Sequence, residues 1–119
     1  MIKSRLLAAV LLLGVCLPRV NAVTGKINNF DPPGSIQTVP LAINSTGTIT
    51  GWYSTGSSKY HGFLRDNLGN ITVIDAPGAA NVTLPYAIND SGSIVGQYVD
   101  DATAQHSFLR DSAGGFQGE

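Results

Sequence analysis

Two histidines are the side chains of this sequence best suited to chemistry near neutral pH. They are His61 and His106, which stand 45 residues apart and are each followed by one small residue and a phenylalanine. An imidazole can bind a metal or act as an acid–base group. At the start of a strand directly after a loop, it commonly bonds a neighbouring carboxylate or backbone group. We therefore expect structural roles for both histidines, with ligand binding and metal binding as the alternatives.

Carboxylates offer a second chemistry. Asp90, Asp100 and Asp101 could attract calcium, but they lack the spaced carboxylates and terminal glutamate of an EF-hand loop. The sequence has no Gly-x-Ser-x-Gly elbow, and its only glutamate is Glu119, so a glycosidase would have to rely on aspartates. The sequence thus assigns no catalytic, cofactor-binding or metal-ligating residue, and it predicts a protein that is not an enzyme and carries no cofactor.

The first 22 residues have the order of a signal peptide. Two basic residues precede the apolar run Leu6–Leu17, and Val20-Asn21-Ala22 offers a small-residue cleavage site. The run is shorter than the roughly 20 residues that span a bilayer. We expect residues 1–22 to be removed and the chain that begins at Val23 to be secreted into the extracellular space, with no membrane span.

The composition of the chain after the leader excludes several classes of binding partner. Val23–Glu119 keeps four basic and eight acidic side chains, a formal charge of −4. Without a basic patch, nucleic acid and anionic membrane surfaces are poor partners. The single cysteine, Cys16, lies in the leader, so neither a disulfide framework nor a cysteine-based zinc site is expected.

The segment of sequence that contains each histidine occurs twice in the chain. Pro40–Ile74 aligns with Pro85–Glu119 at an offset of 45 residues, with 14 identical pairs in 35 positions. A period near 40 to 50 residues is typical of repeat architectures. We place a β-repeat region at residues 23–119, with repeat 1 at about 30–74 and repeat 2 at about 75–119.

Each repeat reads as short strands separated by turn residues. The β-branched and aromatic runs alternate with Gly, Asn, Asp and Ser clusters, and no segment after the leader has helical periodicity. The expected strands are 39–43, 48–53, 61–66 and 71–75, then 84–88, 93–98 and 106–111. The second repeat is expected to break off at Phe116–Glu119, where its fourth strand belongs.

This pattern predicts an all-β fold of tandem four-stranded antiparallel repeats of about 45 residues, each like a β-propeller blade. The consecutive pairs Phe63-Leu64 and Phe108-Leu109 fit sheets that are covered on both faces. A propeller needs roughly 4 to 8 blades, so about two blades make an incomplete one. We expect the chain to be the N-terminal piece of a longer protein or a truncated gene product.

Residues that recur in both repeats are expected to serve the scaffold. Mid-strand glycines permit close backbone approach, glycines that end tight turns supply positive φ, and turn asparagines bond their own backbone. These positions are Gly51 and Gly96, Gly47 and Gly92, and Asn44 and Asn89.

Several of these motifs together resemble the HAF family of probable extracellular bacterial repeats. They are Phe30–Gly34, Ala42-Ile43-Asn44, and the triplets His61-Gly62-Phe63 and His106-Ser107-Phe108, whose middle residue differs from the alanine of the family name. The resemblance implies export and a β-repeat fold, and it transfers no catalytic residues.

The sequence therefore favours a secreted, non-catalytic β-repeat scaffold or binding module whose partner is an extracellular glycan or protein. Its contacts would come from the variable loops 54–60 and 99–105, and from Trp52 and Tyr60, whose rings suit stacking on sugars. The alternative is the N-terminal part of a secreted propeller enzyme acting on glycans, with its catalytic aspartates beyond Glu119.

Overall fold

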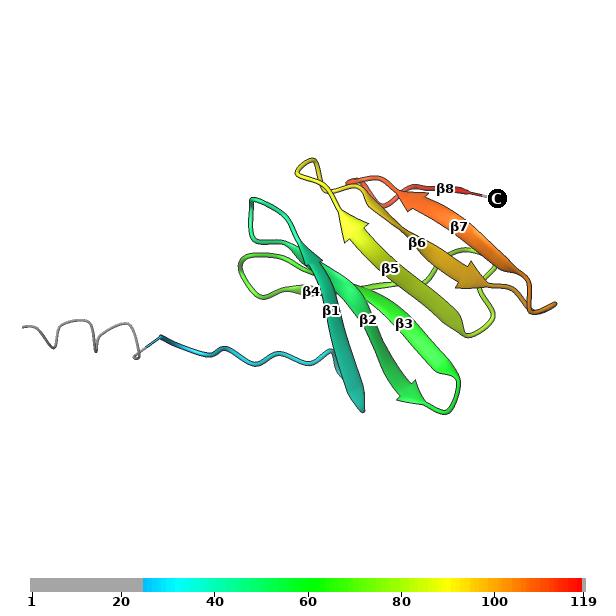
Figure 1. The fold of residues 1–119 in the computed structure, drawn as a ribbon, viewed down its shortest axis with the longest axis horizontal. Coiled ribbons are helices and arrows are strands. Elements are labelled where there is room, and N and C mark those ends of the chain that lie inside the picture. Colours follow the sequence, from blue (N-terminus) through cyan, green and yellow to red (C-terminus); the bar gives the residue numbers. More distant parts are fainter. Residues whose placement is uncertain (1–24, 119) are drawn as a thin grey trace, which may run out of the picture. The chain divides into compact units, whose positions relative to one another are not determined.

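A computed structural model describes residues 25–118 of the chain, so the expected leader lies outside the described residues. Within that range all regular secondary structure is β-strand, and no helix is long and apolar enough to cross a membrane. The chain divides into two units, Met1–Phe30 and Asp31–Glu119, and residues 25–30 of the first have no regular structure. The strands of the second unit are β1 Gln37–Ile43, β2 Ile49–Gly56, β3 Lys59–Arg65, β4 Ile71–Ile74, β5 Val82–Ile88, β6 Ile94–Val99, β7 Gln105–Arg110 and β8 Phe116–Gly118 (Figure 1).

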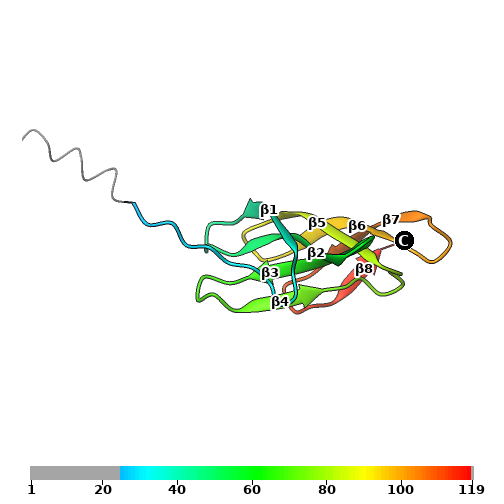
Figure 2. The same ribbon diagram turned by 90° about the horizontal axis from the view of Figure 1, so that it is seen from below.

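The eight strands form one open sheet. Its order is β1-β2-β3-β5-β6-β7-β8, and β4 pairs with β3 beside this path. Every pairing is antiparallel except that of β3 with β5, which consists of one parallel pair, Tyr60 with Val82. In Figure 2, β4 and β8 lie on the side opposite β1 and β5. Sequence repeat 1 therefore supplies β1–β4 and sequence repeat 2 supplies β5–β8.

Strand register is the same in the two repeats. Pro40 lies opposite Gly51 and Pro85 lies opposite Gly96, and a β-bulge follows each proline. Proline cannot donate a ladder hydrogen bond, so it is tolerated where the pairing is interrupted. A Cβ on Gly51 would lie 2.8 Å from Pro40 Cα, and one on Gly96 would lie 2.7 Å from Pro85 Cα. The close backbone approach predicted at both glycines is confirmed.

The turns between the first two strands of each repeat also match. Asn44 Oδ1 accepts hydrogen bonds from Thr46 N at 3.1 Å and Thr48 N at 2.9 Å, and Asn89 Oδ1 accepts one from Ser93 N at 2.8 Å. The turn glycines that follow have φ of +85° and +89°. Asparagine and glycine thus serve the turns, as the sequence predicts.

Most of the hydrophobic core lies between the repeats. We call front the side of each repeat that carries the histidine and phenylalanine of its third strand, and back the opposite side, which carries Leu64 or Leu109. Ile74 and Leu64, on the back of repeat 1, pack with Ile94 and Phe108, on the front of repeat 2. Each repeat therefore covers one face of the other.

Two expectations need correction. The fourth strand of repeat 2 forms, because β8 pairs with β7 and Phe116 packs on Phe108 with ring centroids 5.7 Å apart. The loop expected over residues 54–60 is much shorter, since β2 runs to Gly56 and β3 begins at Lys59. Ser58 adopts a φ of +59°, and this left-handed conformation closes the hairpin in very few residues.

Candidate ligand-binding groove

The two histidines occupy separate hydrogen-bonded pairs. His61 Nδ1 lies 2.8 Å from Asp75 Oδ1, whereas His106 Nε2 lies 2.7 Å from Asp100 Oδ2. Each ring also packs against a tyrosine of the neighbouring strand, Tyr53 at 5.3 Å and Tyr98 at 5.0 Å between centroids. Both imidazoles thus contact a carboxylate and an aromatic ring of the scaffold.

Asp100 is held as a carboxylate. The hydrogen bond with His106 and those from Ala104 N and Ala102 N lower the pKa of Asp100 below its ordinary value. A general acid needs the opposite shift, since it must hold a proton near neutral pH. Asp100 is therefore suited to accept hydrogen bonds from a ligand and unsuited to donate a proton to one.

Two of the aspartates considered for calcium, Asp90 and Asp100, bind other partners. Asp90 Oδ1 accepts a hydrogen bond from Ser45 N at 2.9 Å, which lowers the pKa of Asp90. Asp100 is paired with His106. Among the described residues, no three His, Cys, Asp or Glu side chains gather as a metal site would require.

The second and third strands of each repeat meet in hairpins whose turns lie beside one hollow. It has a volume of about 370 Å³ and is lined by Ser58 from the first hairpin and by Asp100, Asp101 and Thr103 from the second. Ser58 and Thr103 occupy equivalent positions and are the non-glycine residues with positive φ in the described chain. The rest of the lining is Ala80 and Asn81 from the connector between the repeats (residues 75–81), Val82 from β5 and Val99 from β6.

An aromatic hollow of about 390 Å³ shares Val82 with this polar one. It is lined by Trp52, Tyr60, Val82, Leu84 and Tyr86. The rings of Trp52 and Tyr60 meet edge to face, with centroids 5.4 Å apart and planes at 83°. Tyr86 is 43% exposed, and its hydroxyl donates to Gln97 Oε1 at 3.4 Å.

The two hollows adjoin at Val82 of β5, and we call them together the groove, with an aromatic end and a polar end. Two hydrogen bonds of the connector fix this arrangement. Tyr60 N of β3 donates to Asn81 O at 2.8 Å, and Ala80 N donates to Val99 O of β6 at 2.9 Å. Aromatic rings next to carboxylate and amide oxygens can stack on an apolar face and accept hydrogen bonds from hydroxyl groups. The groove therefore suits a ligand that is flat on one side and rich in hydroxyls.

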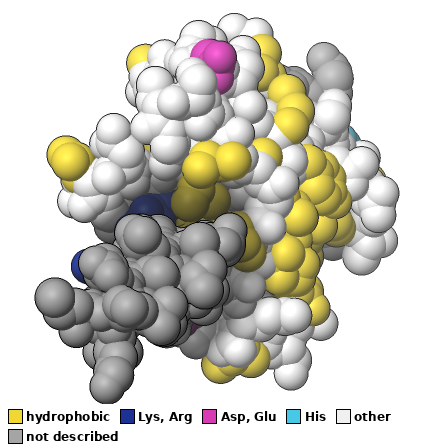
Figure 3. All heavy atoms as spheres, turned by 60° about the vertical axis from the view of Figure 1, so that its left-hand side comes forward, with side chains coloured by type: hydrophobic (Ala, Val, Ile, Leu, Met, Phe, Trp, Pro, Cys, Tyr) yellow, Lys and Arg dark blue, Asp and Glu magenta, His cyan; other side chains and the backbone are white. Residues whose placement is uncertain are grey.

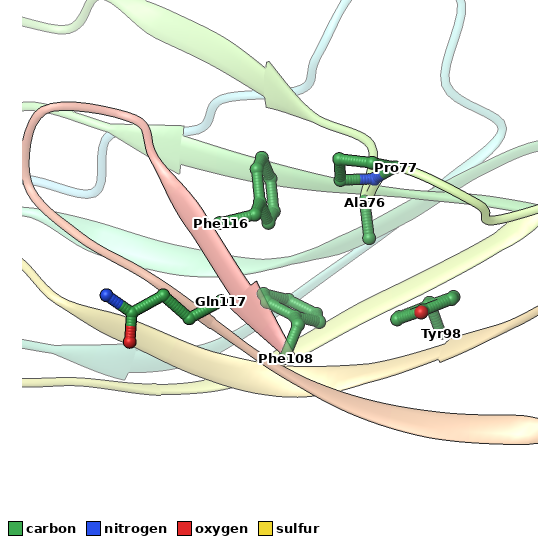
Figure 4. Close-up of a pocket in the computed structure, with 6 residues that line it drawn as sticks. All are labelled: Ala76, Pro77, Tyr98, Phe108, Phe116 and Gln117. Atoms are coloured by element: carbon green, nitrogen blue, oxygen red, sulfur yellow. The ribbon is translucent and has the colours of Figure 1, made fainter. Parts of the chain in front are cut away.

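A third hollow, of about 160 Å³, lies under the connector on the front of repeat 2. Figure 4 shows the rings of Tyr98, Phe108 and Phe116 facing Ala76 and Pro77, while the Gln117 side chain extends away. Because its walls are core residues, we assign this hollow to packing of the connector.

The structure brings together much of what the sequence proposes for binding. Trp52 and Tyr60 line one end of the groove, and the predicted loops 54–60 and 99–105 reach the other through Ser58 and Thr103. Sequence reasoning missed three residues of the groove. It placed Asn81 between the expected strands 71–75 and 84–88, and it placed Leu84 and Tyr86 within the second of these strands. Their part in the groove depends on the parallel contact of β3 with β5, and a single pair carries no sequence signal.

Comparison of the chain with family models, curated proteins and solved structures gave no match.

Proposed function

We propose that this protein is a secreted, non-catalytic binding module for extracellular carbohydrate, built from two consecutive blades of a β-propeller-like array. The groove that holds Trp52 and Tyr60 at one end and Asp100 at the other carries the proposal. The order of residues in the leader supports export, and the resemblance to HAF repeats supports an extracellular repeat protein.

The groove favours a neutral glycan. Asp100 and Asp101 line its polar end, and Asp100 is ionised at neutral pH. Carboxylates repel an anionic polysaccharide but accept hydrogen bonds from sugar hydroxyls. The lowered pKa of Asp100 also favours binding over catalysis, because the groove then lacks a carboxylic acid at this position to protonate a glycosidic oxygen.

The blade-like part of the proposal rests on repeated geometry. Both repeats pair their first two strands in the same register with the same bulge, and the back of one covers the front of the next. Adjacent blades of a propeller meet in this face-to-face manner.

Trp52 makes binding directly observable, because it is the single tryptophan of the chain. We expect its fluorescence to change saturably when the full chain is titrated with cellohexaose, laminarihexaose or chitohexaose, and to be unaffected by alginate oligosaccharides. Release of reducing ends should stay at the level of the sugar alone. If none of the three neutral sugars is bound, the proposal fails.

Calorimetric titration of variants locates the site. Trp52→Ala or Tyr60→Ala should weaken binding about tenfold or more, because truncating a central aromatic contact costs on the order of 2 kcal/mol. Gln105→Ala is the matched control, since Gln105 occupies the position equivalent to Tyr60 but lies outside the groove. Equal affinity of all three variants would place the ligand elsewhere.

A further inference from the structure

The contact between the two repeats joins unlike faces. Gly62, on the back of repeat 1, faces Pro85 on the front of repeat 2, and a Cβ on Gly62 would lie 2.5 Å from Pro85 Cγ. Thr50 on the same back face and Ile94 on the same front face are both 0% exposed. The fold thus contains one complete back-to-front interface.

The front of repeat 1 carries the same residue types as the covered front of repeat 2. Phe63 and Tyr53 on this front are buried, but its β1 part is open. Pro85 is fully buried, whereas its equivalent Pro40 is exposed. Ile88 packs against the core between the repeats, whereas its equivalent Ile43 is 64% exposed. Pro40, Ile43 and Ile49 line an apolar hollow of about 280 Å³ together with Leu41 and Ala42. Figure 3, which views the molecule from the β1 side of Figure 1, shows hydrophobic side chains gathered in a band.

The back of repeat 2 is open in the same way. Val95 is 47% exposed and Leu109 is 37% exposed, whereas their equivalents in repeat 1, Thr50 and Leu64, face the other repeat. Ser107 stands where Gly62 contacts Pro85, and it is exposed. The molecule therefore presents an open β1 part of the front of repeat 1 and an open back of repeat 2, and each matches an area that the contact between the repeats covers.

We propose that copies of this chain associate head to tail, with the front of repeat 1 of one chain seated on the back of repeat 2 of the next. Continuity with the interface inside the chain determines the geometry: Pro40 and Ile43 of one chain contact Ser107 and Val95 of the other. Such a contact joins a different surface patch on each of the two partners. Repeating it therefore builds closed rings or open arrays.

Hydrogen bonds at the turns set the same register. Within the chain, Asn44 Nδ2 donates to Asn89 O at 3.0 Å and Ser45 N donates to Asp90 Oδ1 at 2.9 Å, so residues 45 apart meet. Between chains, the amide of Asn89 faces Asn44 O of the next molecule, and Asp90 N faces the hydroxyl of its Ser45. Both contacts join a donor to an acceptor, and neither buries a charge.

Two lysine substitutions test the proposal because each one blocks a different end. Ile43→Lys blocks the front of repeat 1, and Val95→Lys blocks the back of repeat 2; both positions are exposed, so the fold should tolerate them. Leu68→Lys, in a turn where the side chain is 84% exposed, is the matched control. Sedimentation velocity measures the mass of the species that each full-length protein forms in solution, over a hundredfold range of concentration.

The parent chain and the Leu68→Lys control should associate increasingly with concentration, and each blocked variant should remain monomeric. An equimolar mixture of the two blocked variants should form a 1:1 dimer that grows no further, since it joins the one intact front to the one intact back.

A monomeric parent chain, an undiminished association of either variant, or a mixture that stays monomeric would overturn the proposal. If the mixture is monomeric while the parent associates, another occupant or the sheet edge is responsible. Ile43→Gln and Ser107→Arg replace the lysine variants if circular dichroism shows that either has lost its thermal transition.

Discussion

Glycines at equivalent strand positions show how single residues serve this scaffold. Gly51 and Gly96 lie opposite a proline that begins a bulge, and the carbonyl oxygen of Val39 or Leu84 occupies the place of their missing side chain. The contact involves backbone atoms, which cannot rotate away as a side chain would. Any larger residue must therefore deform the pairing of the first two strands.

Gly96→Val should lower the free energy of unfolding by about 3 kcal/mol, because overpacking costs 1 to 3 kcal/mol and more where rigid atoms oppose it. Gly56→Ala is the control: no atom lies within 4 Å of its added Cβ, so a change of less than about 0.5 kcal/mol is expected. Urea denaturation of the full chain measures both. Equal stability of the two variants would show that the sheet shifts to admit the valine.

The two repeats approach closely where a small residue of one strand faces a rigid ring of another. Gly62 of β3 lets Pro85 of β5 approach, and Ile74 O lies 3.0 Å from the place of the missing Cβ. At the equivalent position of β7, Ser107 faces solvent. The third strand of repeat 1 therefore needs a small residue at this position, whereas the third strand of repeat 2 does not.

Gly62→Val should separate the repeats and destabilise the chain by about 2 kcal/mol, within the range for small-to-large changes in a packed interior. Ser107→Val, at the exposed equivalent, should change stability by less than about 0.5 kcal/mol. Both are measured by denaturation at low chain concentration, so that association between chains does not contribute. A larger loss for Ser107→Val than for Gly62→Val would contradict the assigned interface.

Three carboxylates of the second unit are hydrogen-bonded in the fold and contribute to its response to acid. Bonds from Asn70 to Asp66, from Ser45 to Asp90 and from His106 to Asp100 lower the pKa of each carboxylate. A carboxylate with a lowered pKa stabilises the fold above its unfolded pKa of about 3.9, and this stabilisation is lost as the pH falls through the lower, folded value.

Acid should therefore weaken the protein below about pH 4, the ordinary pKa of an aspartate. Asp100→Asn should make the decline of the melting temperature between pH 5 and pH 2 shallower, because this carboxylate no longer takes up a proton on unfolding. The measurement is a series of thermal scans by circular dichroism. If the variant declines as steeply as the parent, the pairing of Asp100 with His106 does not contribute to the acid response.

Local pattern predicted the strands and turns closely. Six of the seven expected strands lie within two residues of both observed ends, and the seventh, expected over 48–53, extends three residues further, to Gly56. The asparagine and glycine positions serve the turns as expected. These features depend on neighbouring residues, whose alternation and turn chemistry stand in the sequence. The fourth strand of repeat 2 was missed because three residues at the end of the chain show too little alternation, although packing of Phe116 on Phe108 secures them.

The sequence by itself determined the all-β class, the two repeats and the residues that shape each turn, because these follow from spacing along the chain. Only the tertiary structure decided which faces of the repeats meet and that Trp52, Tyr60 and Asp100 line one groove with Tyr86. The two repeats share one pattern of strands and turns, so that pattern alone cannot distinguish the face that is covered from the one that stays open. That difference arises when Pro85 packs against Gly62 while its equivalent Pro40 remains exposed.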